Sequence, residues 1–249
     1  MTRLVRAEFT KLRTTRLIYG MAAVMAAFAV LTVVAGMAYA GREGNPSLSA
    51  DSLAMFVAGP VALVSGAALL LGILGMTGEF RHQTVTQTFL VTPNRGRVVA
   101  AKLVAYPLAG IALALITLAV TAAVAAGWLA AKGITPSLSD ARLASIVGVA
   151  LLGAGLCALV GVGVGALVRN QVAALVGTLV WVLVVEGLLM SLINIPSLGK
   201  WLPSAAAAAA ITSPGGAHLS RLGGTLLLAG YALALALAGT RLVVRRDIT

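Results

Sequence analysis

Six long apolar runs decide what this chain can fold into. Each exceeds the roughly 20 residues that a helix needs to cross the hydrocarbon layer of a bilayer. Only 10% of the 249 residues are charged, whereas soluble domains carry about 25%, so too little polar sequence remains to cover a globule. Because backbone groups in lipid must be satisfied within the segment, we predict an all-α polytopic membrane protein. The predicted spans are residues 17–40, 53–76, 98–131, 143–168, 172–195 and 222–244.

The whole chain, residues 1–249, is expected to form one membrane domain. Its third run is too long for a simple span, so we expect the first turns, around Lys102, to lie at the interface, with Pro107 as a possible kink site. Between the fifth and sixth spans, residues 194–221 form the longest external segment. Six alanines at 205–210 favour a short helix there, either re-entrant or on the outer surface.

The distribution of Lys and Arg predicts the orientation. Most of the 18 basic residues precede the first span, lie between the second and third spans, or follow the sixth. By the positive-inside tendency, both termini are then cytoplasmic, in a multi-pass protein of the cell membrane. The net charge of +11 is accounted for by topology and by attraction to the lipid bilayer's anionic head groups, so we expect no nucleic-acid partner.

Residues 1–16 have the pattern of an amphipathic interfacial helix. Val5, Phe9, Leu12 and Arg16 recur at helical spacing, and the other basic residues, among them Arg13, lie off that stripe. Such a helix suits the head-group layer of the inner leaflet. A disordered basic tail is the alternative, because a segment this short need not be helical alone.

The chain contains no pattern for catalysis or for nucleotide binding. Its one Gly-Lys pair, Gly199-Lys200, is followed by Trp201 and so is not a phosphate-binding loop. His82 and His218 are predicted on opposite faces and Cys157 lies in a span, so we expect no metal site and no catalytic residue. The glycines at 161, 163 and 165 lie in an apolar span, where close helix packing is their expected role.

Glu186 is the single acidic residue inside a predicted span. An ionised carboxylate at that depth costs about 3 kcal/mol on insertion scales, so its side chain should face protein or water. It could belong to a substrate path, or it could hold a helix interface together. The sequence does not decide between the two.

One polar stretch, GEFRHQTVTQTFLVTPNRGR, interrupts the first half of the chain at residues 78–97. Its alternating threonines could indicate a strand, but a lone strand at a membrane surface has no pairing partner. A short surface helix ending before Pro93, with a turn at 94–96 into the third span, is the preferred interpretation. An ordinary solvated loop is the alternative.

These residues resemble a known family. The segment EFTKLRTTR before the first span, the second span continuing into GEFRHQTVTQTFLVTPNRGRVVAAK, and six spans with both ends inside are similar to the membrane subunit of type-2 ABC exporters. The similarity is strongest to the short permeases frequent in actinobacteria. It covers essentially the whole chain, and Glu-Phe-Arg followed by Thr84, Pro93 and Arg95 is its most specific part.

The resemblance implies a function for the polar stretch. In that family the cytoplasmic segment, here residues 77–97, docks on a separate ABC ATPase that binds the ATP and Mg²⁺, so this chain binds no cofactor. Two ATPase copies and a second permease, as a homodimer or heterodimer, would complete an exporter of a drug, peptide or lipid-like substrate. The residues that would form or support the docking face are Glu79, Phe80, Arg81, His82, Gln83, Thr84 and Thr88.

Two other functions remain open on the sequence. An ion-coupled secondary transporter would use Glu186, although the spans offer no second acidic residue and no obvious pair of broken helices. A non-transporting immunity or scaffold protein would bind a peptide without moving it. A gene for a soluble ATPase beside this one would favour the exporter.

Overall fold

The computed structural model describes residues 1–42, 52–84, 90, 94–134, 140–192, 199–211 and 219–245. Within these ranges the regular elements are all helical, which confirms the predicted fold class. Six helices are long and apolar enough to cross a membrane, as predicted. They are Leu17–Tyr39, Leu63–Arg81, Arg95–Ala131, Val147–Val168, Gln171–Leu189 and Arg221–Val243.

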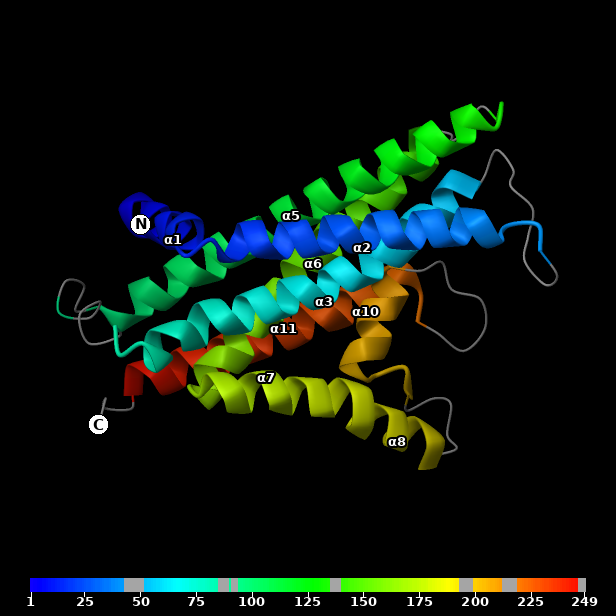
Figure 1. Ribbon diagram of the computed structural model, residues 1–249. Coiled ribbons are helices and arrows are strands. Elements are labelled where there is room, and N and C mark those ends of the chain that lie inside the picture. Colours follow the sequence, from blue (N-terminus) through cyan, green and yellow to red (C-terminus); the bar gives the residue numbers. More distant parts are fainter. Residues whose placement is uncertain are drawn as a thin grey trace.

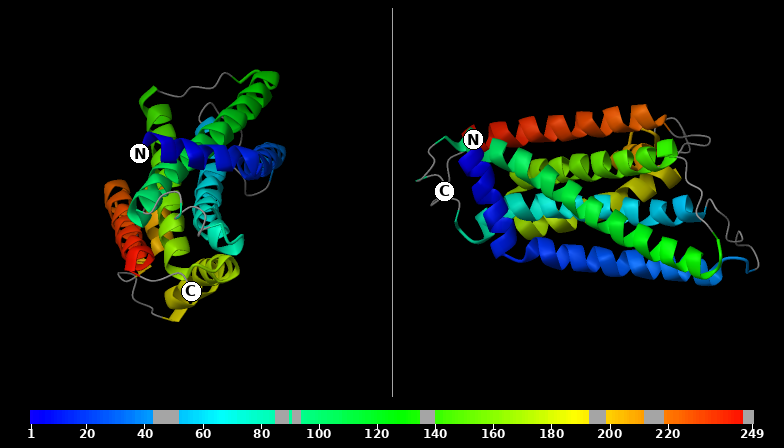
Figure 2. Two further views of the ribbon diagram at one scale, coloured as in Figure 1. Left: turned by 90° about the vertical axis from the view of Figure 1, so that its left-hand side faces the viewer. Right: turned by 90° about the horizontal axis from the view of Figure 1, so that it is seen from above.

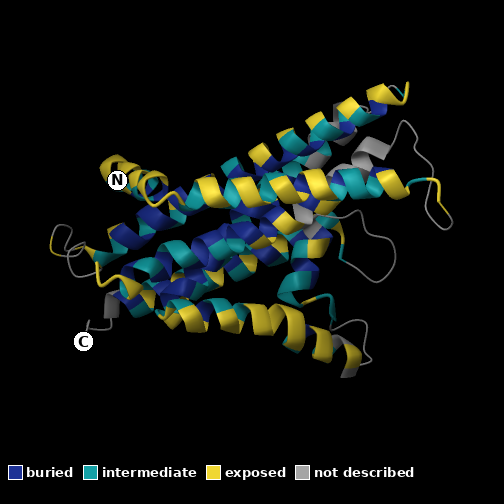
Figure 3. Ribbon diagram, viewed as in Figure 1, coloured by how far each residue is buried: buried dark blue, intermediate teal, exposed yellow. Residues whose placement is uncertain are grey.

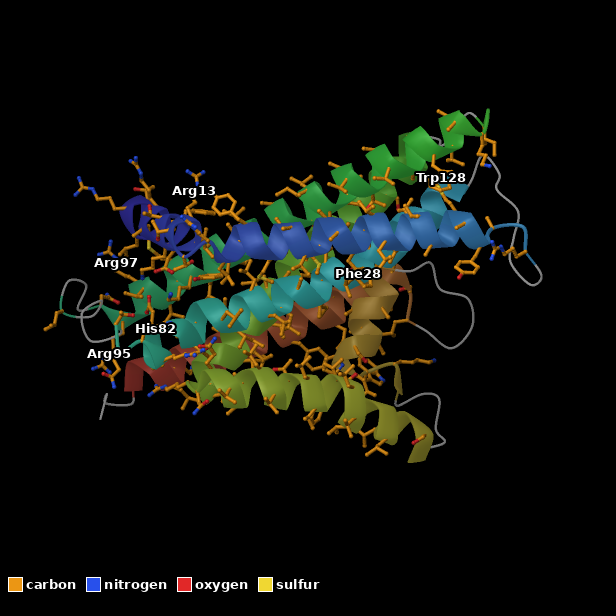
Figure 4. All side chains as sticks on the ribbon, in the orientation of Figure 1. Arg13, Phe28, His82, Arg95, Arg97 and Trp128 are labelled. Atoms are coloured by element: carbon orange, nitrogen blue, oxygen red, sulfur yellow. The ribbon has the colours of Figure 1, made fainter. Side chains whose placement is uncertain are left out.

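The spans run side by side as a bundle, and the N-terminal helix α1 lies across one end of it (Figures 1 and 2). The start of α1 and the end of α11 lie at that end, which we call the basic end because Arg13, Arg95 and Arg97 are found there, far from Trp128 (Figures 1 and 4). In chain order the first helices are α1 (Thr2–Thr14), α2 (Leu17–Tyr39), α3 (Ser52–Arg81) and α5 (Arg95–Ala131). They are followed by α6 (Asp140–Val168), α7 (Gln171–Val180), the π-helix η1 (Trp181–Val185), α8 (Glu186–Leu192), α10 (Pro203–Ile211) and α11 (Arg221–Arg245).

Helix α1 forms as the amphipathic pattern predicts, but it ends before Arg16. That residue has a backbone φ of 55° and lies in the tight turn into α2. Its predicted place on the apolar stripe is therefore wrong. Leu12 is buried against the bundle and Phe9 packs at the edge of the same cluster, whereas Arg13 is exposed.

The centre of the bundle is the crossing of α3 and α6, which is closed by glycines. A Cβ atom at Gly161 would lie 2.1 Å from the carbonyl oxygen of Leu69, and one at Gly72 would lie 2.2 Å from that of Ala158. A Cβ atom at Gly163 would lie 2.7 Å from the Cβ atom of Leu235, so this glycine lets α6 approach α11. Small residues let backbones approach where lipid supplies no hydrophobic drive for association. The packing role predicted for the glycines at 161, 163 and 165 is confirmed, because a Cβ atom at any of the three would lie within 2.8 Å of a neighbouring helix.

Two spans are less buried than the other four. Only 11% of the apolar window is buried in α2 and in the fifth span, which comprises α7, η1 and most of α8, against 56% in α3. Their outward side chains, such as Leu31 and Leu183, are exposed and apolar (Figure 3). Such surfaces suit contact with lipid or with another membrane subunit.

The α3–α6 crossing generates a stability prediction. Gly161→Ala should lower the free energy of unfolding by about 1–3 kcal/mol, because the new methyl group meets backbone that cannot move aside. The measurement is the thermal unfolding of the detergent-purified protein. Gly148→Ala is the matched control, since it lies on the same helix with nothing within 4 Å of its Cβ position. Equal shifts in the two variants would contradict the packing role.

Candidate functional site at the basic end of the bundle

Four charged side chains from three helices meet beneath the basic end, and we call them the charge cluster: Glu8, Lys11, Glu79 and Lys102. The Lys102 ammonium lies 2.8 Å from a carboxylate oxygen of Glu8 and 3.0 Å from one of Glu79. The Lys11 ammonium lies 2.8 Å from Glu8 and 2.6 Å from Glu79. Each base thus bridges both acids, so the cluster ties α1, α3 and α5 together at one point.

Three members of the cluster are buried. Lys102 is 1% exposed, Glu8 3% and Glu79 8%. Lys102 also donates a hydrogen bond to the carbonyl oxygen of Gly75, at 3.1 Å. Burying an isolated charge costs several kcal/mol, and here two acids and two bases offset one another. Loss of any buried member would leave an uncompensated charge.

The local sequence explains how α1 reaches the cluster. Glu8 and Leu12 are four residues apart and share one helix face, on which Leu12 packs with Met76, Val99 and Tyr106. The apolar contact holds the helix down, and the same face delivers the carboxylate to Lys102. The amphipathic stripe therefore docks on the bundle itself.

Tyr106 and glycine at position 75 shape the floor of the site. A Cβ atom at Gly75 would lie 1.8 Å from the Tyr106 ring, so glycine at this position of α3 leaves room for the ring of α5. The Lys102 ammonium lies 5.5 Å from the centroid of the same ring, within range of a cation–π interaction. The third run's predicted interfacial start therefore holds a buried, fully paired lysine.

Lys11 is the most accessible member of the cluster. Burial by itself would lower the pKa of Lys11, but its hydrogen bonds to Glu79 and Glu8 outweigh this effect and hold the pKa above its ordinary value. A raised pKa stabilises the folded chain while the ammonium is charged, so this contribution is present throughout neutral pH. It is lost only when the pH rises through the raised pKa.

The residues predicted to couple to an ATPase divide into two groups. Glu79 belongs to the charge cluster, and Phe80 packs against the core with the Arg169 guanidinium 5.7 Å from its ring centroid. These two residues form the first group. Arg81, the last residue of α3, begins the second group and donates a hydrogen bond of 3.3 Å to Gln171.

The second group faces outward. Arg81, His82, Gln83 and Thr84 are all exposed, and Gln83 adopts a left-handed backbone conformation with φ 54°. His82 lies among the basic side chains of this end (Figure 4). Thr88 lies outside the described residues. The structure thus separates an inward pair, Glu79 and Phe80, from an outward edge, residues 81–84.

A cavity of about 630 Å³ lies beside the cluster. Its walls come from α1, the start of α2, α3, α5 and Gln171 at the start of α7, and its polar side carries Lys11, Glu79 and Lys102.

The chemistry of the site is that of ion pairing. Among the described residues, no group of three His, Cys, Asp or Glu side chains could hold a metal. The arrangement is suited to joining helices mechanically.

Glu186 lies away from this cluster. Its side chain is 2% exposed, and one oxygen accepts hydrogen bonds from the Ser204 backbone N–H, at 3.1 Å, and from the Ser204 hydroxyl. Of the two roles left open by the sequence, a contact between helices is thus observed directly, because Glu186 joins α8 to the first turn of α10.

Sequence reasoning missed the partnership of Glu8 and Lys102. A signal was present, because Glu8 is the one acid among the bases of residues 2–14 and Lys102 is the one charge in the run at 98–131. Two opposite charges at otherwise unsuitable positions could have been paired. Their separation of 94 residues hid the connection.

Comparison with known proteins identifies the class. A family model described as "ABC-2 family transporter protein" matches residues 4–185, a region that contains the whole charge cluster. No curated protein matches the chain. The chain belongs to the ABC-2 transporter family, and it is an ABC transporter permease, as its resemblance to the type-2 exporters implied.

The cluster generates a prediction about a buried charge. Lys102→Met should lower the free energy of unfolding by about 3–5 kcal/mol, because it leaves two buried carboxylates with one base. Thermal unfolding in detergent measures the effect, with Lys132→Met, an exposed lysine just beyond the other end of α5, as the matched control. Adding Glu8→Gln to Lys102→Met should restore part of the loss. A double variant as unstable as the sum of the two single variants would contradict the pairing.

Proposed function

We propose that this permease is the membrane subunit of an exporter driven by a separate ABC ATPase, which docks on residues 77–97. The observation that carries the proposal is the outward polar edge, residues 81–84, at the end of the most buried span, α3. The sequence has no phosphate-binding loop of its own. ATP and Mg²⁺ are therefore assigned to the partner subunit.

The charge cluster supports this function because it fixes the end of α3 to two neighbours. A force applied at residues 81–84 acts one turn away from Glu79, which is ion-paired to Lys11 of α1 and Lys102 of α5. Because a buried ion pair is costly to break, the three helices should move as one body. Docking at the edge would thereby shift the bundle, as transport coupled to a conformational change requires.

The burial of Glu79 refines its role. It supports the docking face from beneath, together with Phe80, while Arg81, His82, Gln83 and Thr84 offer the contact surface. Thr88 stays a predicted contributor. Reversal of the Glu79 charge would disrupt the charge cluster and detach α1 and α5 from α3, so that variant cannot test docking alone.

The complete exporter would contain two ATPase copies and a second permease, identical or related. Its termini would face the cytoplasm of the cell, with α1 in the head-group layer, as the distribution of basic residues predicts. The substrate, a drug, peptide or lipid-like molecule, would leave from the cytoplasm or from the inner leaflet.

The docking proposal predicts an effect of charge on the outward edge. Arg81→Glu together with His82→Glu should reduce, by at least about tenfold, the amount of ATPase that copurifies with the permease, because buried interface contacts are lost. The ATPase tested is the one encoded nearest this gene, in detergent or nanodiscs. Unfolding temperatures should stay near that of the wild type.

Arg3→Glu with Arg6→Glu is the control for a general loss of positive charge, since both residues are exposed on α1 at the same end. That variant should retain the ATPase. Retention by the edge variant would place docking elsewhere, and a wild type that binds no ATPase would remove the basis of the exporter proposal.

A further inference from the structure

A second cavity, of about 390 Å³, lies between the fifth span and the rest of the bundle. Its walls come from α3, α6, α7, η1, α10 and α11, and they are almost wholly apolar. Two of the polar side chains on its wall are already satisfied, because the Thr178 hydroxyl donates to the Ala174 carbonyl and the Tyr231 hydroxyl to that of Trp201. The volume falls in the range of ligand clefts, about 300–1,000 Å³.

Glu186 is not itself part of the cavity wall, but residues close to it in the chain and in space are. Val182, one helical turn before it, and Pro203, next to its partner Ser204, both line the wall. One carboxylate oxygen is bonded to Ser204, whereas the other, Oε1, is buried and accepts no hydrogen bond from the described residues. An unsatisfied buried acceptor is costly, so this oxygen needs a donor or a positive charge.

The π-helical segment brings these features together. Residues 181–185 form a π-helix, in which each turn is wider than in an α-helix, and such segments are frequent at functional sites. Trp181 and Val182 of this segment line the cavity, and Glu186 follows it directly. The indole face of Trp181 is also a favourable surface for a cation.

We propose that the cavity and Glu186 form a binding site for an amphipathic cation. The apolar wall would take the hydrophobic body of the ligand, and the nearby carboxylate would take its positive group. The inference builds on the proposed function, because it names the class of exported substrate. It is tested by binding to the permease alone, so its outcome is independent of any ATPase.

The probe is tritiated tetraphenylphosphonium, measured by saturation binding to the permease in detergent. Tetraphenylborate, which has nearly the same shape and the opposite charge, is tested in a separate binding measurement, because the two ions precipitate each other when mixed. We expect the cation to bind saturably at one site per chain and the anion to bind at least about tenfold more weakly. Equal affinity for the two ions would overturn the role of the carboxylate without any variant.

Two variants test the two halves of the site. Glu186→Gln keeps an acceptor for Ser204 and removes the charge, so it should weaken cation binding at least about tenfold and abolish the preference over the anion. Gly177→Leu puts a side chain on the cavity wall, where its Cβ position is open, and should weaken both ions. Gly20→Leu is its control, because Gly20 is equally open but lies on α2.

The outcomes separate the alternatives. Unchanged binding in Glu186→Gln would show that Glu186 only joins α8 to α10 and does not bind the cation. Unchanged binding in Gly177→Leu would place the ligand elsewhere. A wild type that binds neither ion would indicate a cavity filled by a lipid chain or by a second copy of the permease. That result would overturn this inference and leave the docking proposal standing.

Discussion

The attachment of α1 to the bundle depends on the pairing of Lys102 with Glu8. Neither charge could be buried alone, since an isolated ion in a low-dielectric interior costs far more than an average residue contributes to stability. The lysine is buried because α1 supplies the acid, and α1 is docked because the lysine and Leu12 receive it. Glu79 and Lys11 complete the balance of charge. The attachment of three helices is therefore cooperative.

The bundle uses two kinds of attachment at different depths. At its centre, glycines at 72 and 161 let α3 and α6 approach until their backbones almost touch. At its basic end, charge pairing replaces close approach, because α1 lies across the bundle and meets it at few points (Figure 2). Apolar packing alone would specify the position of α1 weakly. The cluster adds directional contacts, and these define where the helix lies.

The helices, which depend on local periodicity, could be predicted from the sequence. Contacts between residues far apart in the chain could not. The six spans and α1 follow from runs of apolar residues and from spacing along one helix face. The resemblance places Glu79 among the residues that form or support the docking face, but its ion pair with Lys102, which lies on another helix, was not predictable from the local sequence. For Glu186 the requirement for a protein partner was predictable from its depth, whereas Ser204 was not, since that contact depends on how α10 folds back. Arg16 failed for a different reason, because a turn interrupts the helical spacing.

The fifth span is held differently from α3, and this difference bears on both proposed sites. Its first residue, Gln171, accepts one exposed hydrogen bond from Arg81, and its far end is joined to α10 through Glu186. An exposed hydrogen bond of 3.3 Å contributes little, about 1 kcal/mol or less, compared with the buried ion pairs of α3. When the end of α3 is displaced, its ion pairs with α1 and α5 should persist, whereas the hydrogen bond from Arg81 to Gln171 of the fifth span should break. Because the apolar cavity lies along that span, the contact expected to yield belongs to the same helix that borders the proposed cation site.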